Sequence, residues 1–260
     1  MSEPLALHVE HQGSGPALVL AHGFGGSARN FRPQARFFAD RVSTWLYDAR
    51  GHARSPAPRA AGAYAPAALI ADFAAVVRQA GAPAVVGGLS LGAYTALGYA
   101  LSAPVAPRGL VLAAFPSPGS EAQRARWASG FADAIEQEGL EKAGERFVWG
   151  EASRFDPKGA ALIRQGFLEH DPFALAAILR DTLAQLPAPD ALASELARLR
   201  VPTLVLVGDD DAESLEPCRR LATLIPDAEL VVVAGAGHVV NLSAPQAFNA
   251  ALAAFLARLD

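Results

Sequence analysis

The run Ala84-Val85-Val86-Gly87-Gly88-Leu89-Ser90-Leu91-Gly92 places a Gly-x-Ser-x-Gly motif between an apolar stretch and a helix-forming stretch. At a sharp turn from a strand into a helix, this motif holds its middle residue in a strained conformation and lifts that side chain above the sheet. The small residues on either side relieve the crowding at the turn. The first N–H groups of the following helix point to the same place and favour negative charge there. The sequence therefore predicts that Ser90 is a nucleophile at the edge of a sheet.

Short apolar runs alternate with helix-forming stretches on both sides of this motif. Continuous apolar runs of about five residues suit strands that are covered on both faces, as in a parallel sheet. We expect strands at residues 5–11, 17–21, 42–47, 84–89, 109–113, 203–207 and 229–233. We expect helices at residues 30–38, 66–79, 91–101, 215–224 and 245–259. This alternation predicts an α/β protein with a mostly parallel central sheet and helices on both faces.

The alternation breaks between residues 117 and 199, which contain no strand-like run. Helices are expected there at residues 121–138, 140–149, 157–169 and 173–186. We expect residues 117–199 to form a helical lid inserted into a core domain of residues 1–116 and 200–260. Abundant alanine blurs the helix phase, so the sequence does not rank the aromatic candidates for the walls of a pocket under this lid. These candidates are Trp127, Phe131, Trp149 and Phe167.

A serine hydroxyl becomes a nucleophile only when a base takes its proton, and His238 is the best placed of the six histidines. It follows the strand-like run at residues 229–233 through a glycine-containing loop. Open parallel sheets place their sites at such carboxyl ends of strands. The histidine needs a carboxylate to fix its tautomer, and Asp209-Asp210-Asp211 follows the strand at residues 203–207. We expect one of these three carboxylates to face His238.

The order Ser, Asp, His, with each residue just after a strand, resembles the alpha/beta-hydrolase family over nearly the whole chain. His22-Gly23-Phe24-Gly25-Gly26 is similar to the family's His-Gly-x-Gly oxyanion loop. The resemblance implies an oxyanion hole made by the backbone N–H groups of Phe24 and Leu91, with a structural role for His22. It also implies that Asp211, in Gly208-x-x-Asp211, is the acid, with Asp209 as the alternative.

The stretch Asp48-Ala49-Arg50-Gly51-His52-Ala53-Arg54-Ser55 is similar to the family's Asp-x-Arg-Gly-x-Gly-x-Ser turn. Ala53 stands where the family pattern has its second glycine, so we expect this turn to differ locally. The polar residues Asp48, Arg50 and His52 are interpreted as loop scaffolding rather than as catalysts.

A serine, a histidine and an aspartate beside two N–H donors carry out acyl transfer. We expect a serine hydrolase that cleaves a small to medium carboxylic ester or a lactone through an acyl-enzyme, with no metal and no organic cofactor. A carbon–carbon bond hydrolase, an enol-lactonase, an acyltransferase or thioesterase, and a perhydrolase use the same triad and remain alternatives. A ligand-binding protein without turnover is a further alternative, although such proteins typically lose a triad member.

The composition excludes several classes of protein. The 260 residues are 52% hydrophobic and carry a formal net charge of -4, which argues against a nucleic-acid partner. The single cysteine, Cys218, excludes a disulfide framework and is expected to be an inert packed thiol. No apolar run is long enough to span a membrane, and residues 1–4 show no signal peptide. We therefore expect a cytoplasmic location and a small-molecule substrate, and the sequence identifies no oligomeric partner.

Overall fold

The computed structural model describes residues 5–81, 83–115, 120–150 and 157–259, and it contains a single seven-stranded sheet in that part of the chain. The strand order is β1-β3-β2-β4-β5-β6-β7, and β1 alone runs antiparallel to its neighbour. The strands are β1 (Val9–Gln12), β2 (Ala17–Ala21), β3 (Ser43–Tyr47), β4 (Val85–Leu89), β5 (Gly109–Ala113), β6 (Thr203–Gly208) and β7 (Ala228–Val233). The expected mostly parallel α/β architecture is confirmed.

The apolar runs become strands because both of their faces are covered. Every residue of β4, β5 and β6 is buried, as a parallel sheet with helices on both faces requires. At the edge of the sheet, β1 has no fully buried residue. It spans four residues and begins at Val9, whereas the expected strand covers residues 5–11.

Helices cover the two faces of the sheet and form two separate cores. The first face carries α2 (Pro66–Ala80), α3 (Leu91–Ser102) and α8 (Ala212–Leu224). The second face carries α1 (Arg32–Phe37) and α10 (Pro245–Arg258). Cys218 of α8 is 0% exposed in the first core, and burial raises the pKa of its thiol to about 12. This agrees with the expectation of an inert packed thiol.

Between β5 and β6 the chain forms a group of helices that we call the helical insertion. Its elements are α4 (Glu121–Gly144), η2 (Glu145–Trp149), α5 (Pro157–Phe167), α6 (Pro172–Asp181), η4 (Leu183–Gln185), η5 (Pro189–Leu192) and α7 (Ala193–Leu196). The expected division between two helices near residue 139 is present as a kink inside α4, where Gly139 has φ 84°. The expected start of the insertion at residue 117, like residues 1–4, lies outside the described residues.

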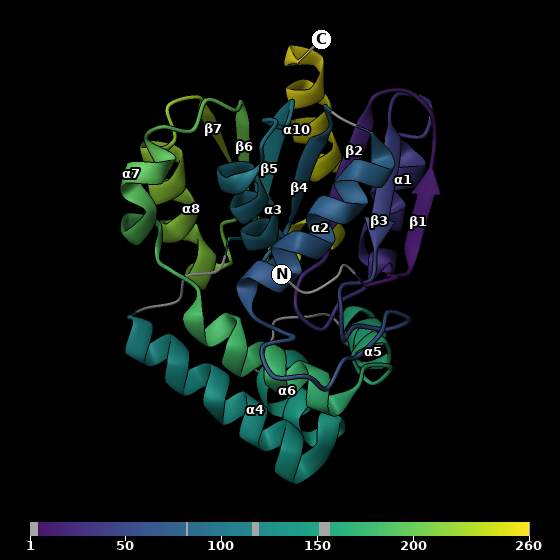
Figure 1. The fold of residues 1–260 in the computed structure, drawn as a ribbon, viewed down its shortest axis with the longest axis vertical. Coiled ribbons are helices and arrows are strands. Elements are labelled where there is room, and N and C mark those ends of the chain that lie inside the picture. Colours follow the sequence, from purple (N-terminus) through teal and green to yellow (C-terminus); the bar gives the residue numbers. More distant parts are fainter. Residues whose placement is uncertain (1–4, 82, 116–119, 151–156, 260) are drawn as a thin grey trace.

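Figure 1 shows α4, α5 and α6 gathered at one end of the sheet, opposite the end where α10 finishes. Side-chain contacts join this insertion to the core loops. Arg29 pairs with Glu169 at 2.7 Å, Arg59 pairs with Asp171 at 2.6 Å, and the hydroxyl of Thr182 donates to the carbonyl of Tyr64. The insertion therefore lies against the loops that follow the parallel strands.

Two short elements complete the core, η1 (Ala28–Phe31) after β2 and α9 (Val240–Ser243) after β7. No described helix is both long enough and apolar enough to cross a membrane.

Candidate active site

Ser90 occupies the sharp turn between β4 and α3. Its backbone has φ 55° and ψ -117°, a conformation that an L-residue with a side chain adopts at an energetic cost. A hydrogen bond of 2.8 Å from its N–H to the carbonyl of Ala113 fixes the turn to β5. Close packing requires the glycines of the motif, because a Cβ on Gly92 would lie 2.1 Å from the carbonyl oxygen of Ala21. The turn holds Ser90 as the motif predicts, with the residue 8% exposed.

Asp211 and His238 meet at the carboxyl ends of β6 and β7. The distance from His238 Nδ1 to Asp211 Oδ2 is 2.8 Å, and Ser214 Oγ lies 3.4 Å from the same ring nitrogen. Burial acts to raise the pKa of the Asp211 carboxyl, but the hydrogen bond and charge of His238 and the bonds from Ser214 outweigh it. The pKa of Asp211 is therefore below its ordinary value, and the carboxylate is ionised beside the ring.

Asp209 has a different role in the same loop. Its Oδ1 accepts a hydrogen bond of 2.7 Å from the backbone N–H of Gly235, so it ties the loop after β6 to the loop that carries His238. Of these two aspartates, Asp211 is the one that contacts the imidazole.

The structure brings together two of the three predicted triad side chains directly. Within the described part of the chain, no hydrogen bond joins Ser90 Oγ to His238 Nε2. Ser90 nevertheless follows β4, which is separated from β6 by β5 alone, so the three residues follow strands at the same edge of the sheet. The side chain of His238 is 43% exposed, and its Nε2 is left available because Asp211 engages Nδ1. Hydrogen bonds between a nucleophile and its base are often long or poorly aligned before substrate binds.

The loop after β2 packs against the turn of Ser90. A Cβ placed on Gly23 would lie 3.3 Å from the Cβ of Ser90, so the two segments are in close contact. Gly25 has φ 68°, which turns the loop back. The N–H groups of Phe24 and Leu91 are not among the donors that are hydrogen-bonded in the described turns and caps. Those turns and caps therefore leave both N–H groups unoccupied.

Buried neutral histidines support this loop. His22 Nδ1 lies 2.7 Å from the carbonyl of Gly23, and its Nε2 accepts from the N–H of Ala49 at 2.9 Å. The Nε2 of His52 accepts from the N–H of Gly25 at 3.2 Å. Burial lowers the pKa of His22, and burial together with the neighbouring ring of His22 lowers the pKa of His52 well below its ordinary value. Both rings are thus neutral, with the tautomer fixed by their partners.

His170 of the helical insertion continues the same row of rings. Its centroid lies 5.1 Å from that of His52, and its Nε2 donates to the carbonyl of Gly26 at 3.1 Å. Burial, with the neighbouring His22, lowers its pKa to about 4.

The turn after β3 is a buried polar scaffold, as its motif suggests. Asp48 accepts from the N–H of Ala28 at 2.8 Å and from the guanidinium of Arg54 at 2.7 Å. Arg50 and Asp72 form a buried ion pair at 2.7 Å. Ala53 has φ 42°, which lies in the left-handed region that favours glycine. The expectation that this turn differs locally from the family pattern stays a prediction.

The predicted pocket aromatics do not share one environment. Phe131 and Phe167 are each 1% exposed, and the Phe24 centroid lies 5.8 Å from the first and 6.3 Å from the second. The Trp149 ring contacts Phe167 at 5.5 Å. Trp127 is 41% exposed and lines a separate space between α4 and α8. Three of the four candidates therefore pack in one cluster over the loop of Phe24, and Trp127 lies at its edge.

Ser214 is a site residue that sequence reasoning missed. It lies three residues after Asp211, in the first turn of α8, which is the spacing of a helix cap. That spacing could have indicated it. Among the described residues there is no group of three or more His, Cys, Asp or Glu that could hold a metal ion.

Comparison with known proteins agrees with the observed fold. A profile described as the Alpha/beta hydrolase family matches residues 18–251. The chain belongs to the alpha/beta hydrolase family, and we class it as a hydrolase.

Individual relatives differ in size and in reported activity. The chain is 32% identical to the polyketide synthase ThaQ of Burkholderia thailandensis over 94% of its own length, but it spans only 12% of that protein. It is 28% identical to 3-oxoadipate enol-lactonase 2 of Acinetobacter baylyi, covering 96% of this chain and 91% of the relative. A solved esterase from Thermogutta terrifontis with malate bound is 28% identical and superimposes with a TM-score of 0.84, over 97% of this chain and 93% of the other.

Proposed function

We propose that the chain is a serine hydrolase that cleaves a small to medium carboxylic ester or a lactone. The observation that carries this proposal is the 2.8 Å contact between His238 and the buried Asp211, at the sheet edge where Ser90 sits in a strained turn. A buried carboxylate that fixes the imidazole tautomer and leaves the other nitrogen open is what a base for a serine nucleophile needs.

The reaction proceeds in two halves. His238 Nε2 takes the proton of Ser90 while the hydroxyl oxygen attacks the acyl carbon, and the carbonyl oxygen becomes an oxyanion. The N–H groups of Phe24 and Leu91 stabilise this charge, and a donor of this kind is worth about 3–4 kcal/mol of barrier. The leaving alkoxide receives the proton from His238. A water molecule then attacks the acyl-enzyme by the same steps, which releases the acid and restores Ser90.

The helical insertion serves as the lid of this site. Its buried aromatics pack on Phe24, next to the proposed oxyanion donor, and its His170 bonds the carbonyl of Gly26. Movement of α4 and α5 relative to the loop would expose Phe131 and Phe167 as apolar walls for the acyl or alcohol part of a substrate.

The relatives support the reaction class. One is named as an enol-lactonase and another as an esterase, and both names describe attack on an acyl carbon bound to oxygen. Carbon–carbon bond hydrolysis, acyl transfer and thioester hydrolysis use the same triad and are separated from ester hydrolysis by assay.

The test is a panel of p-nitrophenyl esters and lactones of increasing acyl length, with fluorophosphonate labelling of the same protein. We expect turnover by the wild type, one label per chain, and loss of both in Ser90→Ala. His238→Ala should retain the fold and lose turnover. The exposed serine of α3 provides the matched control, Ser102→Ala, which should behave as the wild type.

A folded wild type that neither takes the label nor turns over any ester or lactone would favour a ligand-binding protein. Labelling that persists in Ser90→Ala would place the nucleophile elsewhere.

A further inference from the structure

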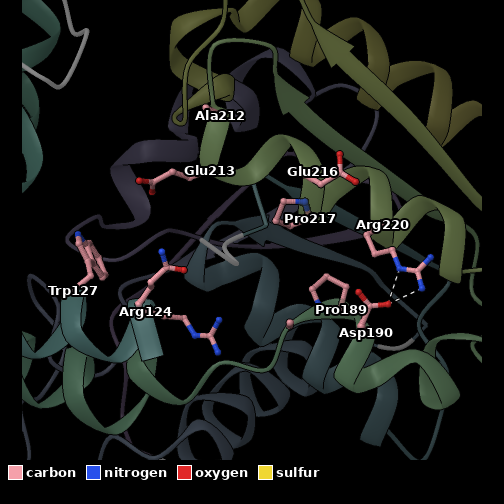
Figure 2. A pocket seen from close by; sticks show the side chains of 11 residues that line it. Arg124, Trp127, Pro189, Asp190, Ala212, Glu213, Glu216, Pro217 and Arg220 are labelled. Carbon is pink, nitrogen blue, oxygen red and sulfur yellow. Dashed lines mark hydrogen bonds and ion pairs between the residues drawn. The ribbon is translucent and has the colours of Figure 1, made fainter. Parts of the chain in front are cut away.

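A pocket of about 620 Å³ lies between α4 of the helical insertion and α8 of the core, and neither Ser90 nor His238 lines it. Figure 2 shows Arg124 and Trp127 reaching it from α4, and Ala212, Glu213, Glu216 and Pro217 forming the α8 side. The short segment before α7 supplies the remaining wall through Pro189 and Asp190.

Arg124 is a buried cation with unsatisfied donors in this pocket. The residue is 3% exposed, and its Nε and Nη1 are buried without a hydrogen-bond partner among the described residues. Burial lowers the pKa of its guanidinium, and the charge of Glu121 opposes this only partly. A buried charge without a partner is costly, and most proteins avoid it. A ligand anion that reached these unpartnered N–H groups would remove this cost by accepting from them.

The other charged side chains around the pocket do not neutralise the guanidinium of Arg124. The second arginine, Arg220, already has a partner, since it contacts Asp190 at 2.6 Å. The carboxylates of Glu213 and Glu216 are on exposed residues at the α8 side, and Glu216 lies 3.8 Å from Arg219. These acids and Asp190 would repel a dianion more strongly than a monoanion. The pocket therefore suits a single negative charge that lies deep beside Arg124.

The α8 side adds a helix start to this cation. Helix α8 has 13 residues and begins at Ala212, and both Ala212 and Glu213 line the pocket. The free N–H groups and the dipole of a helix start favour an anion. With Arg124 on the opposite wall, two independent features of the structure point to the same ligand charge.

The pocket adjoins the loop that carries the proposed acid. Ala212 directly follows Asp211, the proposed acid. On the other side, the ring of Trp127 lies 5.8 Å from that of Phe131, and Phe131 lies 5.8 Å from Phe24. Trp127 thus connects the wall of the pocket to the buried aromatic cluster that packs on Phe24.

We propose that Arg124 binds a carboxylate of the substrate, so that the ester or lactone derives from an acid with a second, free carboxylate. This inference rests on the proposed function for the place of the ester, but the anion site itself does not depend on turnover.

Paired substrates test the charge preference. The anionic ester is the mono-p-nitrophenyl ester of glutaric acid, and the neutral one is p-nitrophenyl valerate, which has the same acyl length. In Arg124→Met we expect KM for the anionic ester to rise at least tenfold with kcat nearly unchanged, and the neutral ester to change less than twofold. Arg126→Gln, on an exposed residue of the same helix, is the control for net charge and should keep the wild-type ratio. An unchanged ratio in Arg124→Met would overturn the proposal.

Binding to Ser90→Ala gives a readout without turnover. We expect glutarate to raise the melting temperature of Ser90→Ala and to have no effect on the double variant with Arg124→Met. Methionine removes an unpartnered charge, so the variant should fold, and Arg124→Lys, which keeps a cation, should retain part of the glutarate effect.

The outcomes separate the two proposals. Glutarate binding that depends on Arg124, in a wild type that cleaves no ester, retains the anion site and rejects the proposed function. Ester turnover with no charge preference and no glutarate binding retains the function and rejects the anion site. Equal stabilisation by inorganic phosphate would reject the assignment to a carboxylate.

Discussion

His238 Nδ1 lies 2.8 Å from Asp211 Oδ2, while Asp209, two residues earlier, binds a backbone N–H instead of the imidazole. This difference predicts the ranking of two equivalent substitutions. Asp211→Asn should lower kcat about 10⁴-fold, because the amide favours the wrong tautomer of the ring. Asp209→Asn should cost less than tenfold, since an amide oxygen can still accept from Gly235. Steady-state kinetics on one ester compare the two variants, and the opposite ranking would move the acid to position 209.

The backbone conformation of Ala53 predicts that glycine at this position stabilises the protein. Its φ of 42° lies in the region where an L-residue is strained and glycine is not. We expect Ala53→Gly to raise the free energy of unfolding by about 0.5–1 kcal/mol, measured by urea denaturation. Ala65→Gly is the matched control, because Ala65 has φ -62° and gains nothing from the change. A loss of stability at both positions would show that the turn at Ala53 is not strained.

The close packing around Gly92, in the turn after Ser90, predicts that a larger residue at this position destabilises the protein. A Cβ there would meet the carbonyl oxygens of Ala21 and His22 at 2.1 and 2.7 Å, and both belong to backbone that cannot move alone. Gly92→Ala should lower the free energy of unfolding by about 3 kcal/mol or more. In Gly130→Ala, where nothing lies within 4 Å of the new Cβ, stability should rise by about 0.5–1 kcal/mol. Thermal unfolding of the two variants distinguishes crowding from a general effect of added methyl groups.

His170 predicts a pH dependence of stability. Its pKa is about 4 in the folded protein and about 6.5 in an unfolded chain. Between these values the unfolded chain binds a proton that the folded protein does not, so stability falls as the pH decreases from about 6.5. The loss from this residue is about 2 kcal/mol at pH 5.

The variant His170→Gln should therefore lose about 2 kcal/mol less than the wild type between pH 7 and pH 5 in urea denaturation. Between pH 7 and pH 8 the two proteins should change in parallel, which serves as the internal control. Identical losses at pH 5 would mean that His170 is not held neutral by burial.

The central strands of the sheet could be predicted from the sequence because each one is a continuous apolar run, which is a local property of the chain. The runs that became β4, β5 and β6 are continuously apolar, and in the structure they are buried on both faces. The turn at Ser90 was also predictable, since a glycine on each side of the serine is needed wherever backbone approaches so closely.

Other features depend on contacts between distant segments and have no local signal. Choosing Asp211 over Asp209 required the resemblance to a family, because three consecutive aspartates look alike in sequence. The unsatisfied guanidinium of Arg124 is visible only when α4 and α8 are placed together. The exposed position of Trp127, at the edge of the cluster that contains Phe131 and Phe167, depends on the phase of α4, which its many alanines conceal.

The positive φ of Ser90 has a consequence for laboratory evolution of this protein. Glycine at position 90 would relax the backbone, so a screen for heat tolerance alone would enrich chains that have lost the hydroxyl. Selection rounds for this scaffold must therefore score product formation together with melting temperature, because thermostability and chemistry favour different residues at this position.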